Sequence, residues 1–286
     1  YAITLLLLEY EQYLWALPLG TFISTAIIVI YFFGINRKWF KFKLFHFEYV
    51  KQLLKIGAPL VPNFLIYWVF NSSDRIMLTS LLGNEYTGIY AVGARVSHIS
   101  YLVHTAFAGG WQYFAFSTMR DDDQVELTSN IFEYLGALAS VAGMLMASLS
   151  YFLFKFFFEE DYVQGYIVAP WLFLAPLIQM LYQVIGNQFL VIKKTWPSMM
   201  ILGSGALINI VINLYFIPLV GIEGAAIATL WGYLVAVIVA VIVLSRMKLV
   251  RISRRFGIIL IVVNLFFIIW RIFLTKKTVL GLLWAI

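Results

Sequence analysis

Five ionisable residues lie where this chain is otherwise apolar. Asp74 and Arg75 follow the apolar stretch PNFLIYWVF, Arg95 lies further on, and His98 and His104 come shortly after it. A permanently charged guanidinium offers a planar fork of donors that suits a phosphate, and an imidazole can exchange a proton near neutral pH. These residue types indicate anion binding and proton transfer as the candidate chemistry.

The spacing of Asp74 and Arg95 predicts an ion pair. The turn between their two apolar stretches is centred near Asn84 and Glu85, between Asp74 and Arg95. At 1.5 Å per residue, both charges lie about 15 Å from that turn on neighbouring antiparallel helices. We expect Asp74 to pair with Arg95 and Arg75 to point elsewhere. Two interpretations are open: the pair holds two helices together, or its members contact a substrate or a proton.

Uncharged polar side chains form two further stripes. They recur every four residues, which places each stripe on one face of a helix. Such side chains either bond membrane helices together or line a hydrated path for a sugar, which needs many neutral donors and acceptors. The candidate cavity residues are Arg75, Arg95, Gln179, Gln183, Asn187, Asn209 and Asn213. His98 and His104 are candidates for proton coupling, with hydrogen-bonded packing as the alternative.

No arrangement typical of an enzyme is found in the sequence. It contains no cysteine, glycine-rich phosphate loop, HExxH or nucleophile elbow. The run from Asp121 to Asp123 resembles a metal or sugar-nucleotide site, but three consecutive carboxylates on a helix cannot face one ion, so a solvated turn is the better interpretation. We expect a protein that is not an enzyme and has no catalytic residue, metal or cofactor.

The elements that position these residues are expected to be membrane helices. The 286 residues are 63% hydrophobic and 12% charged, against about 25% charged in a soluble domain. Because a helix needs about 20 apolar residues to cross a bilayer, the sequence predicts an all-α polytopic membrane protein with about eight complete transmembrane helices and partial ones at both ends. The complete spans are expected at 13–33, 57–82, 88–117, 130–157, 164–192, 197–219, 222–245 and 256–274, and the partial ones at 1–8 and 278–286.

Basic residues set the expected orientation. Most of the 20 Lys and Arg residues lie in the loops 34–56, 118–129, 193–196 and 246–255, on one side of the predicted membrane. By the positive-inside rule this side is cytoplasmic, and the protein is expected to span the cell membrane several times. No basic stretch forms a separate domain, so the net charge of +6 indicates topology and contact with anionic lipid rather than nucleic acid.

A family resemblance is carried by residues 47–99, FEYVKQLLKIGAPLVPNFLIYWVFNSSDRIMLTSLLGNEYTGIYAVGARVSHI. This stretch resembles the start of the second lobe of polysaccharide flippases of the O-antigen or teichoic type, in the multidrug/oligosaccharidyl-lipid/polysaccharide exporter (MOP) superfamily. The matching marks are Gly57-x-Pro59-x-x-Pro62, Ser73-Asp74-Arg75, the Gly83 turn and Gly88-Ile89-Tyr90. GGWQYFAF and NIVINLYFIPLVGIEGAAIATLWGY match further segments, so the resemblance covers residues 13–250.

The resemblance implies a fold and a function. Such proteins have two six-helix lobes, often followed by two extra helices, and move oligosaccharides on a polyprenyl pyrophosphate carrier to the outer leaflet by alternating access. Residues 1–56 would be the last helix of the first lobe with a basic connector, 57–245 the second lobe, and 246–286 the trailing helices. We then expect a fragment whose partners are lipid-linked oligosaccharide, membrane lipids, the missing first lobe and a glycan polymerase machinery.

The family's cavity is cationic and holds the pyrophosphate. That makes Arg75 and Arg95 its expected lining, with Asp74 holding one of them in place. Three alternatives stay open. One is an ion-coupled exporter of a drug or peptidoglycan lipid precursor in the same superfamily. Another is a membrane-embedded glycan polymerase or ligase, against which the short outer loops count. The last is a structural membrane subunit without transport.

Overall fold

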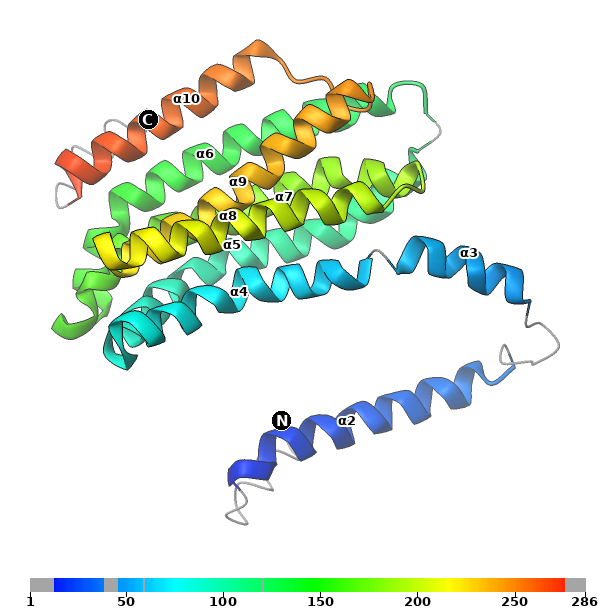
Figure 1. Ribbon diagram of the computed structural model, residues 1–286, viewed down its shortest axis with the longest axis horizontal. Coiled ribbons are helices and arrows are strands. Elements are labelled where there is room, and N and C mark those ends of the chain that lie inside the picture. The colour runs from blue at the N-terminus through cyan, green and yellow to red at the C-terminus, as the bar shows by residue number, and fades with distance from the viewer. Residues whose placement is uncertain (1–12, 39–45, 59, 120, 276–286) are drawn as a thin grey trace. The chain divides into compact units, whose positions relative to one another are not determined.

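The structure is a computed structural model that describes residues 13–38, 46–58, 60–119 and 121–275 (Figure 1). The chain divides into two compact units, residues 1–53 and 54–286. In the first unit, α2 (Tyr13–Asn36) exposes most of its hydrophobic side chains, as a lipid-facing helix does. α3 (Phe47–Gly57) crosses the boundary and is amphipathic, with Glu48 in its first turn and Lys55 in its last, which suits the helix dipole.

The second unit is built from helices joined by short connections. No strand occurs among the described residues, and the all-α fold predicted from the sequence is confirmed. The domain boundaries expected within residues 1–286 stay a prediction. The elements are α4 (Leu60–Leu82), α5 (Asn84–Ser117), α6 (Gln124–Phe157), the 3-10 helix η2 (Glu160–Ile167), α7 (Ala169–Val191), α8 (Trp196–Val220), α9 (Ile222–Arg246), α10 (Arg254–Ile269) and the π-helical turn η3 (Trp270–Leu274).

Seven stretches within the described residues are long and apolar enough to cross a membrane. The helix that falls short of the prediction is α5, although its 34 residues extend about 50 Å. Its Arg95, His98, His104 and Gln112 make it less apolar than its neighbours. The polar residues that make α5 a candidate for function thus also lower its hydropathy, so that it is not counted among the apolar stretches. The partial spans predicted at 1–8 and 278–286 lie outside the described residues.

α7 is the central helix of the second unit. It packs against α5, α6 and α9, and 78% of its membrane-length stretch is buried. α8 and α9 form an antiparallel hairpin, α4 packs against α8, and α10 packs against α6 (Figure 1). Polar side chains on α7 therefore face protein rather than lipid, which is where membrane proteins place functional polar groups.

The connections of the second unit alternate between its two ends (Figure 1). The α4–α5 and α8–α9 turns lie at one end, and the α5–α6, α7–α8 and α9–α10 connections at the other. Gly83 (φ 92°) and Gly221 (φ 69°) make the two tight turns, because the left-handed backbone there favours glycine. The Gly83 turn was expected, but the next helix begins at Asn84 rather than near Gly88.

The hairpin of α8 and α9 is closely packed at two glycines. A Cβ placed on Gly205 would lie 2.5 Å from the Gly232 carbonyl oxygen, and one placed on Gly232 would lie 2.9 Å from the Gly205 carbonyl oxygen. Small residues at a crossing let the backbones of membrane helices approach each other. This contact fixes α8, which carries Asn209 and Asn213, against α9.

We expect Gly205→Val to lower the free energy of unfolding by about 1–3 kcal/mol, because its side chain overpacks the crossing. The measurement is the thermal unfolding midpoint of the protein purified in detergent. Gly88→Ala is the control, since nothing lies within 4 Å of its added Cβ, and it should leave the midpoint unchanged or raise it. If the Gly205→Val protein were as stable as the parent, α8 and α9 could move apart at this crossing without a loss of folding free energy.

Candidate functional site

A carboxylate with four neutral hydrogen-bond donors around it lies inside the bundle. Asp74 of α4 is 3% exposed. It accepts hydrogen bonds from Tyr90 Oη of α5 (2.7 Å), from Asn209 Nδ2 and Asn213 Nδ2 of α8 (3.3 and 2.8 Å), and from Thr229 Oγ1 of α9. We call these five residues the Asp74 cluster. A buried carboxylate is costly without partners, so these donors are what stabilises it there.

The predicted ion pair between Asp74 and Arg95 is not formed. The partners of the Asp74 carboxylate are neutral, and the Arg95 side chain is exposed. The physical reason is helix rotation. Tyr90 is the α5 residue that faces Asp74, and a residue five positions further along a helix points about 140° away. The two charges have similar depths along their helices, but they lie on different faces.

A cavity of about 360 Å³ borders the Asp74 cluster. Asp74, Tyr90 and Thr229 line it, together with Arg75 and His98. We call it the Asp74 cavity. Arg75 therefore lines the same cavity as the buried Asp74 carboxylate. Arg95 lines neither this cavity nor the second cavity described below. Of the two arginines predicted to line a substrate cavity, Arg75 lines a cavity in the structure, and its contact with a substrate stays a prediction.

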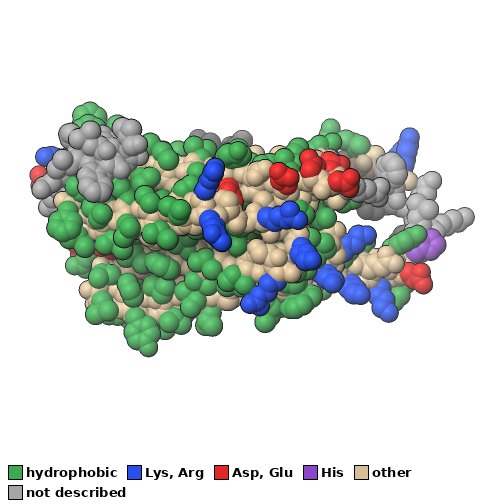
Figure 2. Space-filling view, turned by 90° about the horizontal axis from the view of Figure 1, so that it is seen from above, with side chains coloured by type: hydrophobic (Ala, Val, Ile, Leu, Met, Phe, Trp, Pro, Cys, Tyr) green, Lys and Arg blue, Asp and Glu red, His purple; other side chains and the backbone are tan. Residues whose placement is uncertain are grey.

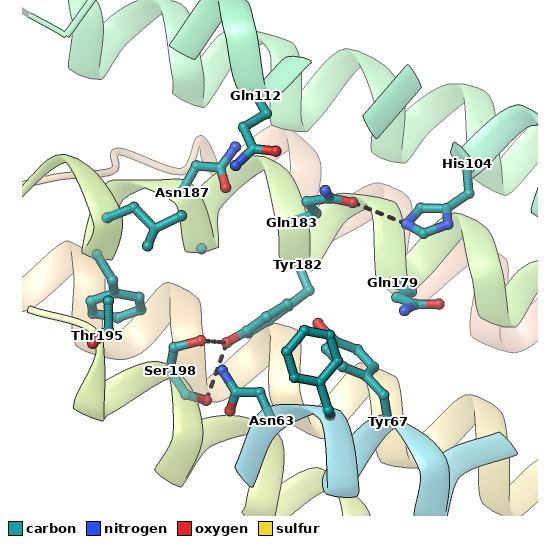
Figure 3. A pocket seen from close by; sticks show the side chains of 14 residues that line it. Asn63, Tyr67, His104, Gln112, Gln179, Tyr182, Gln183, Asn187, Thr195 and Ser198 are labelled. Carbon is teal, nitrogen blue, oxygen red and sulfur yellow. Dashed lines mark hydrogen bonds between the residues drawn. The ribbon is translucent and has the colours of Figure 1, made fainter. Parts of the chain in front are cut away.

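A second cavity, of about 380 Å³, is lined by the polar stripe of α7 (Figure 3). Gln179, Gln183 and Asn187 come from this helix, and α5 contributes His104 and Gln112. We call it the glutamine cavity. None of the described residues that line it is Asp, Glu, Lys or Arg. Gln179 also lines the Asp74 cavity, so the two cavities share a wall.

Several polar atoms of the glutamine cavity have no protein partner. His104 Nε2 lies 3.0 Å from Gln183 Oε1, as Figure 3 shows. Asn63 Oδ1, His104 Nδ1 and Asn187 Nδ2 are buried without a hydrogen-bond partner among the described protein atoms. Buried polar groups of this kind are normally satisfied by water or a ligand. The cavity thus offers both donors and acceptors to a polar guest.

The two polar stripes have different surroundings. The α7 stripe lines the glutamine cavity, whereas Asn209 and Asn213 of α8 are fully buried and turn toward Asp74. Ser73 Oγ also donates to Asn209 Oδ1 (2.8 Å). A polar stripe was expected either to bond helices together or to line a hydrated path. Asn209 and Asn213 bond helices together. Neither asparagine lines the two cavities.

The two histidines also lie apart. His98 is exposed, lines the Asp74 cavity, and has its Nδ1 2.9 Å from the carbonyl oxygen of Ala94. His104 is buried and lines the glutamine cavity. Each cavity therefore contains one imidazole. Proton coupling through either residue stays a prediction.

One ion pair between the described helices was not predicted. Arg271 Nε of η3 lies 2.6 and 2.8 Å from the two carboxylate oxygens of Glu223, which is in the first turn of α9 and 4% exposed. The sequence could have indicated this ion pair, because Arg271 is the one charged residue in the apolar run 256–274 and a charge there needs a partner. Tyr90 and Thr229 were not predicted to contact Asp74, because a neutral donor outside a polar stripe carries no such signal.

The fold and its interior define a class: a helical, multi-pass membrane protein with polar cavities inside its bundle, as transporters have. Residues 1–109 match the family model described as polysaccharide biosynthesis protein. The fold is similar to that of a MOP superfamily transporter from Pyrococcus furiosus Vc1, whose binding pocket is described as having reverse polarity. That similarity has a TM-score of 0.53 and 19% identity, and covers 76% of this chain and 51% of that one. No curated protein matches the sequence at a significant level.

The family model covers the N-terminal part of the chain, and the family resemblance seen in the sequence agrees with this match and with the fold of the solved transporter. The match over residues 1–109 includes Asp74, Arg75 and Tyr90. At 19% identity, the likeness to the solved transporter concerns the fold. The chain spans about half the length of that transporter.

Proposed function

We propose that this chain is part of a flippase that moves polyprenyl-pyrophosphate-linked oligosaccharide units from the cytoplasmic to the outer leaflet of the cell membrane. The product would serve the synthesis of cell-surface polysaccharide, such as O-antigen. The observation that carries the proposal is the pair of adjoining cavities, one with an uncharged polar lining and one with Arg75. The family match over residues 1–109 supports the same assignment.

The two linings suit the two halves of such a cargo. Sugars present many hydroxyl groups and no charge, and the glutamine cavity presents amide, imidazole and hydroxyl groups and no charge. A pyrophosphate is a permanent anion, and the planar guanidinium of Arg75 is the type of group that binds phosphate through two parallel hydrogen bonds. The volumes of 380 and 360 Å³ fall within the range of about 300–1,000 Å³ that ligand pockets have.

Transport of this kind needs no covalent step, and we propose that the protein acts by alternating access without catalysing a reaction. The residues of the two cavities bind and release the cargo. The first lobe of the transporter and a glycan polymerase are the proposed protein partners, and membrane lipids surround the bundle. The basic connections, including loop 34–56, would face the cytoplasm.

The experiment that tests this function uses cells that lack the gene. The measurement is the membrane face on which unpolymerised lipid-linked glycan accumulates, determined with an enzyme or probe that does not cross the membrane. We expect accumulation on the cytoplasmic face. Accumulation on the outer face would mean that a later step is missing, and would replace the flippase with a polymerase or ligase.

A second candidate keeps the fold and changes the cargo: an ion-coupled exporter of a drug or a peptidoglycan lipid precursor. The Asp74 cluster favours it, because a buried carboxylate with neutral partners can accept a proton or a cation. The same deletion strain distinguishes the two. An exporter of another cargo would leave the distribution of lipid-linked glycan unchanged and alter resistance to drugs or the supply of peptidoglycan precursor.

A further inference from the structure

A third cavity opens between α8 and α9, and Thr195 lines both this cavity and the glutamine cavity. Its volume is about 970 Å³, and most of its lining is apolar. Trp196 and Met200 of α8 line it, together with Val239 and Val243 of α9 and Met247, which directly follows α9. Trp196 and Met200 are 61% and 60% exposed. We call this cavity the α8–α9 groove.

The groove has the depth of one membrane leaflet. Its lining runs from Trp196 to Ser204 on α8, and from Val239 on α9 to Met247 just beyond the end of α9, which is about 12 Å along each segment at 1.5 Å per residue. The hydrocarbon of one leaflet is about 15 Å thick, half of the bilayer core. The groove starts at the end of the bundle where the basic connections lie, and the positive-inside rule assigns that end to the cytoplasm.

Three lysines form the mouth of the groove: Lys55, Lys193 and Lys194, all exposed. No Asp or Glu is among the described residues that line it. Figure 2 shows Lys and Arg side chains on the face in view, with hydrophobic side chains and some Asp and Glu side chains near them. The groove therefore combines an apolar floor with a cationic rim.

The backbone around the three lysines is held in place. Thr195 Oγ1 donates to the carbonyl oxygen of Ile56 (3.1 Å), which joins the end of α3, with Lys55, to the α7–α8 connection. Lys194 N donates to the carbonyl oxygen of Phe189 (2.9 Å). These bonds keep two separate segments of the chain at the same mouth, so that their ammonium groups can act on one ligand.

We propose that the α8–α9 groove binds an anionic phospholipid of the cytoplasmic leaflet. Its acyl chains lie along the apolar floor, and its phosphate lies among Lys55, Lys193 and Lys194, because an ammonium group is a good partner for a phosphate oxygen. Trp196 lies at the rim, where interfacial tryptophans meet headgroups. Charge complementarity selects an anionic lipid, since a neutral one leaves three cations without a counter-charge. The site does not depend on which cargo the protein transports.

The test measures lipid binding to the full chain, purified in detergent, by native mass spectrometry with phosphatidylglycerol and with phosphatidylcholine. The parent protein should bind phosphatidylglycerol more tightly than phosphatidylcholine. The triple variant K55Q/K193Q/K194Q should bind phosphatidylglycerol at least about tenfold more weakly and phosphatidylcholine equally well. Val243→Trp leaves every charge in place and fills the floor, and should weaken binding of phosphatidylglycerol as well.

The control variant is R251Q/R254Q/R255Q. It removes the same number of exposed positive charges at three positions that do not line the groove, and it should bind phosphatidylglycerol like the parent. Equal losses in the two triple variants would show general attraction to charge and overturn the site. So would unchanged binding in K55Q/K193Q/K194Q or in Val243→Trp. An equal loss of phosphatidylcholine binding would overturn the selection of an anionic headgroup.

Discussion

Asp74→Ala is expected to lower the free energy of unfolding by about 3 kcal/mol or more, or to prevent folding. Each buried donor left without its acceptor costs about 1–3 kcal/mol, and Asp74 accepts from Tyr90, Asn209, Asn213 and Thr229. Some of these donors can turn to other acceptors, so the expected loss is smaller than the sum. The measurement is the thermal unfolding midpoint in detergent, with the yield of folded protein.

Two variants test whether the loss comes from the Asp74 cluster. Asp74→Asn keeps the volume and one carbonyl acceptor, and should lose much less stability than Asp74→Ala. Asn71→Ala removes an exposed side chain of the same helix, which donates to the carbonyl oxygen of Tyr67 (2.8 Å), and should change the stability little. If Asp74→Ala unfolded at the same temperature as the parent, the cluster would not hold α4 to α5, α8 and α9.

Arg75→Gln is expected to reduce delivery of lipid-linked glycan to the outer leaflet at least about tenfold, with a normal amount of protein in the membrane. Arg75 is the one permanently charged cation among the described residues that line the two cavities. A hydrogen bond to a charged group contributes about 1.5–3 kcal/mol, which corresponds to about tenfold or more in binding. The variant is placed in the chromosomal gene, and outer-leaflet glycan and membrane protein are both quantified.

Two further variants are compared with Arg75→Gln: Arg75→Lys and Arg95→Gln. Lysine keeps the charge and loses the planar fork, so Arg75→Lys should retain part of the activity. Arg95 is exposed and lines neither cavity, so Arg95→Gln should transport nearly as well as the parent. Equal losses at the two arginines would contradict the assignment of the phosphate to Arg75.

The helices could be predicted because membrane spans are a matter of length and hydropathy. The apolar run before Arg246 is long enough to cross a bilayer, and α9 is found there. α5 shows the limit of this rule, because its polar residues lower the hydropathy of a helix that is nonetheless 34 residues long. Its predicted start near Gly88 was also too late, since the helix begins directly after the Gly83 turn.

The sequence drew attention to the residues of the candidate site, but it did not predict the contacts between them. A charge inside an apolar stretch marks a place that needs partners, which drew attention to Asp74. We predicted Arg95 as the partner because it lies at a similar depth along its helix. The prediction was wrong because Arg95 lies on a different face of α5 from Tyr90. The actual partners are neutral, and Thr229 is 155 positions away in the sequence. Composition gives no signal for contacts of that kind.

The Asp74 cluster has a mechanical consequence. Its hydrogen bonds join four helices, α4, α5, α8 and α9, at one point. Sliding any one of them by a helical turn would move its group about 5.4 Å, well beyond hydrogen-bond reach, and would break the hydrogen bonds that this helix contributes to the cluster. We therefore expect α4, α5, α8 and α9 to move together as one rigid unit in any conformational change that keeps the Asp74 cluster intact.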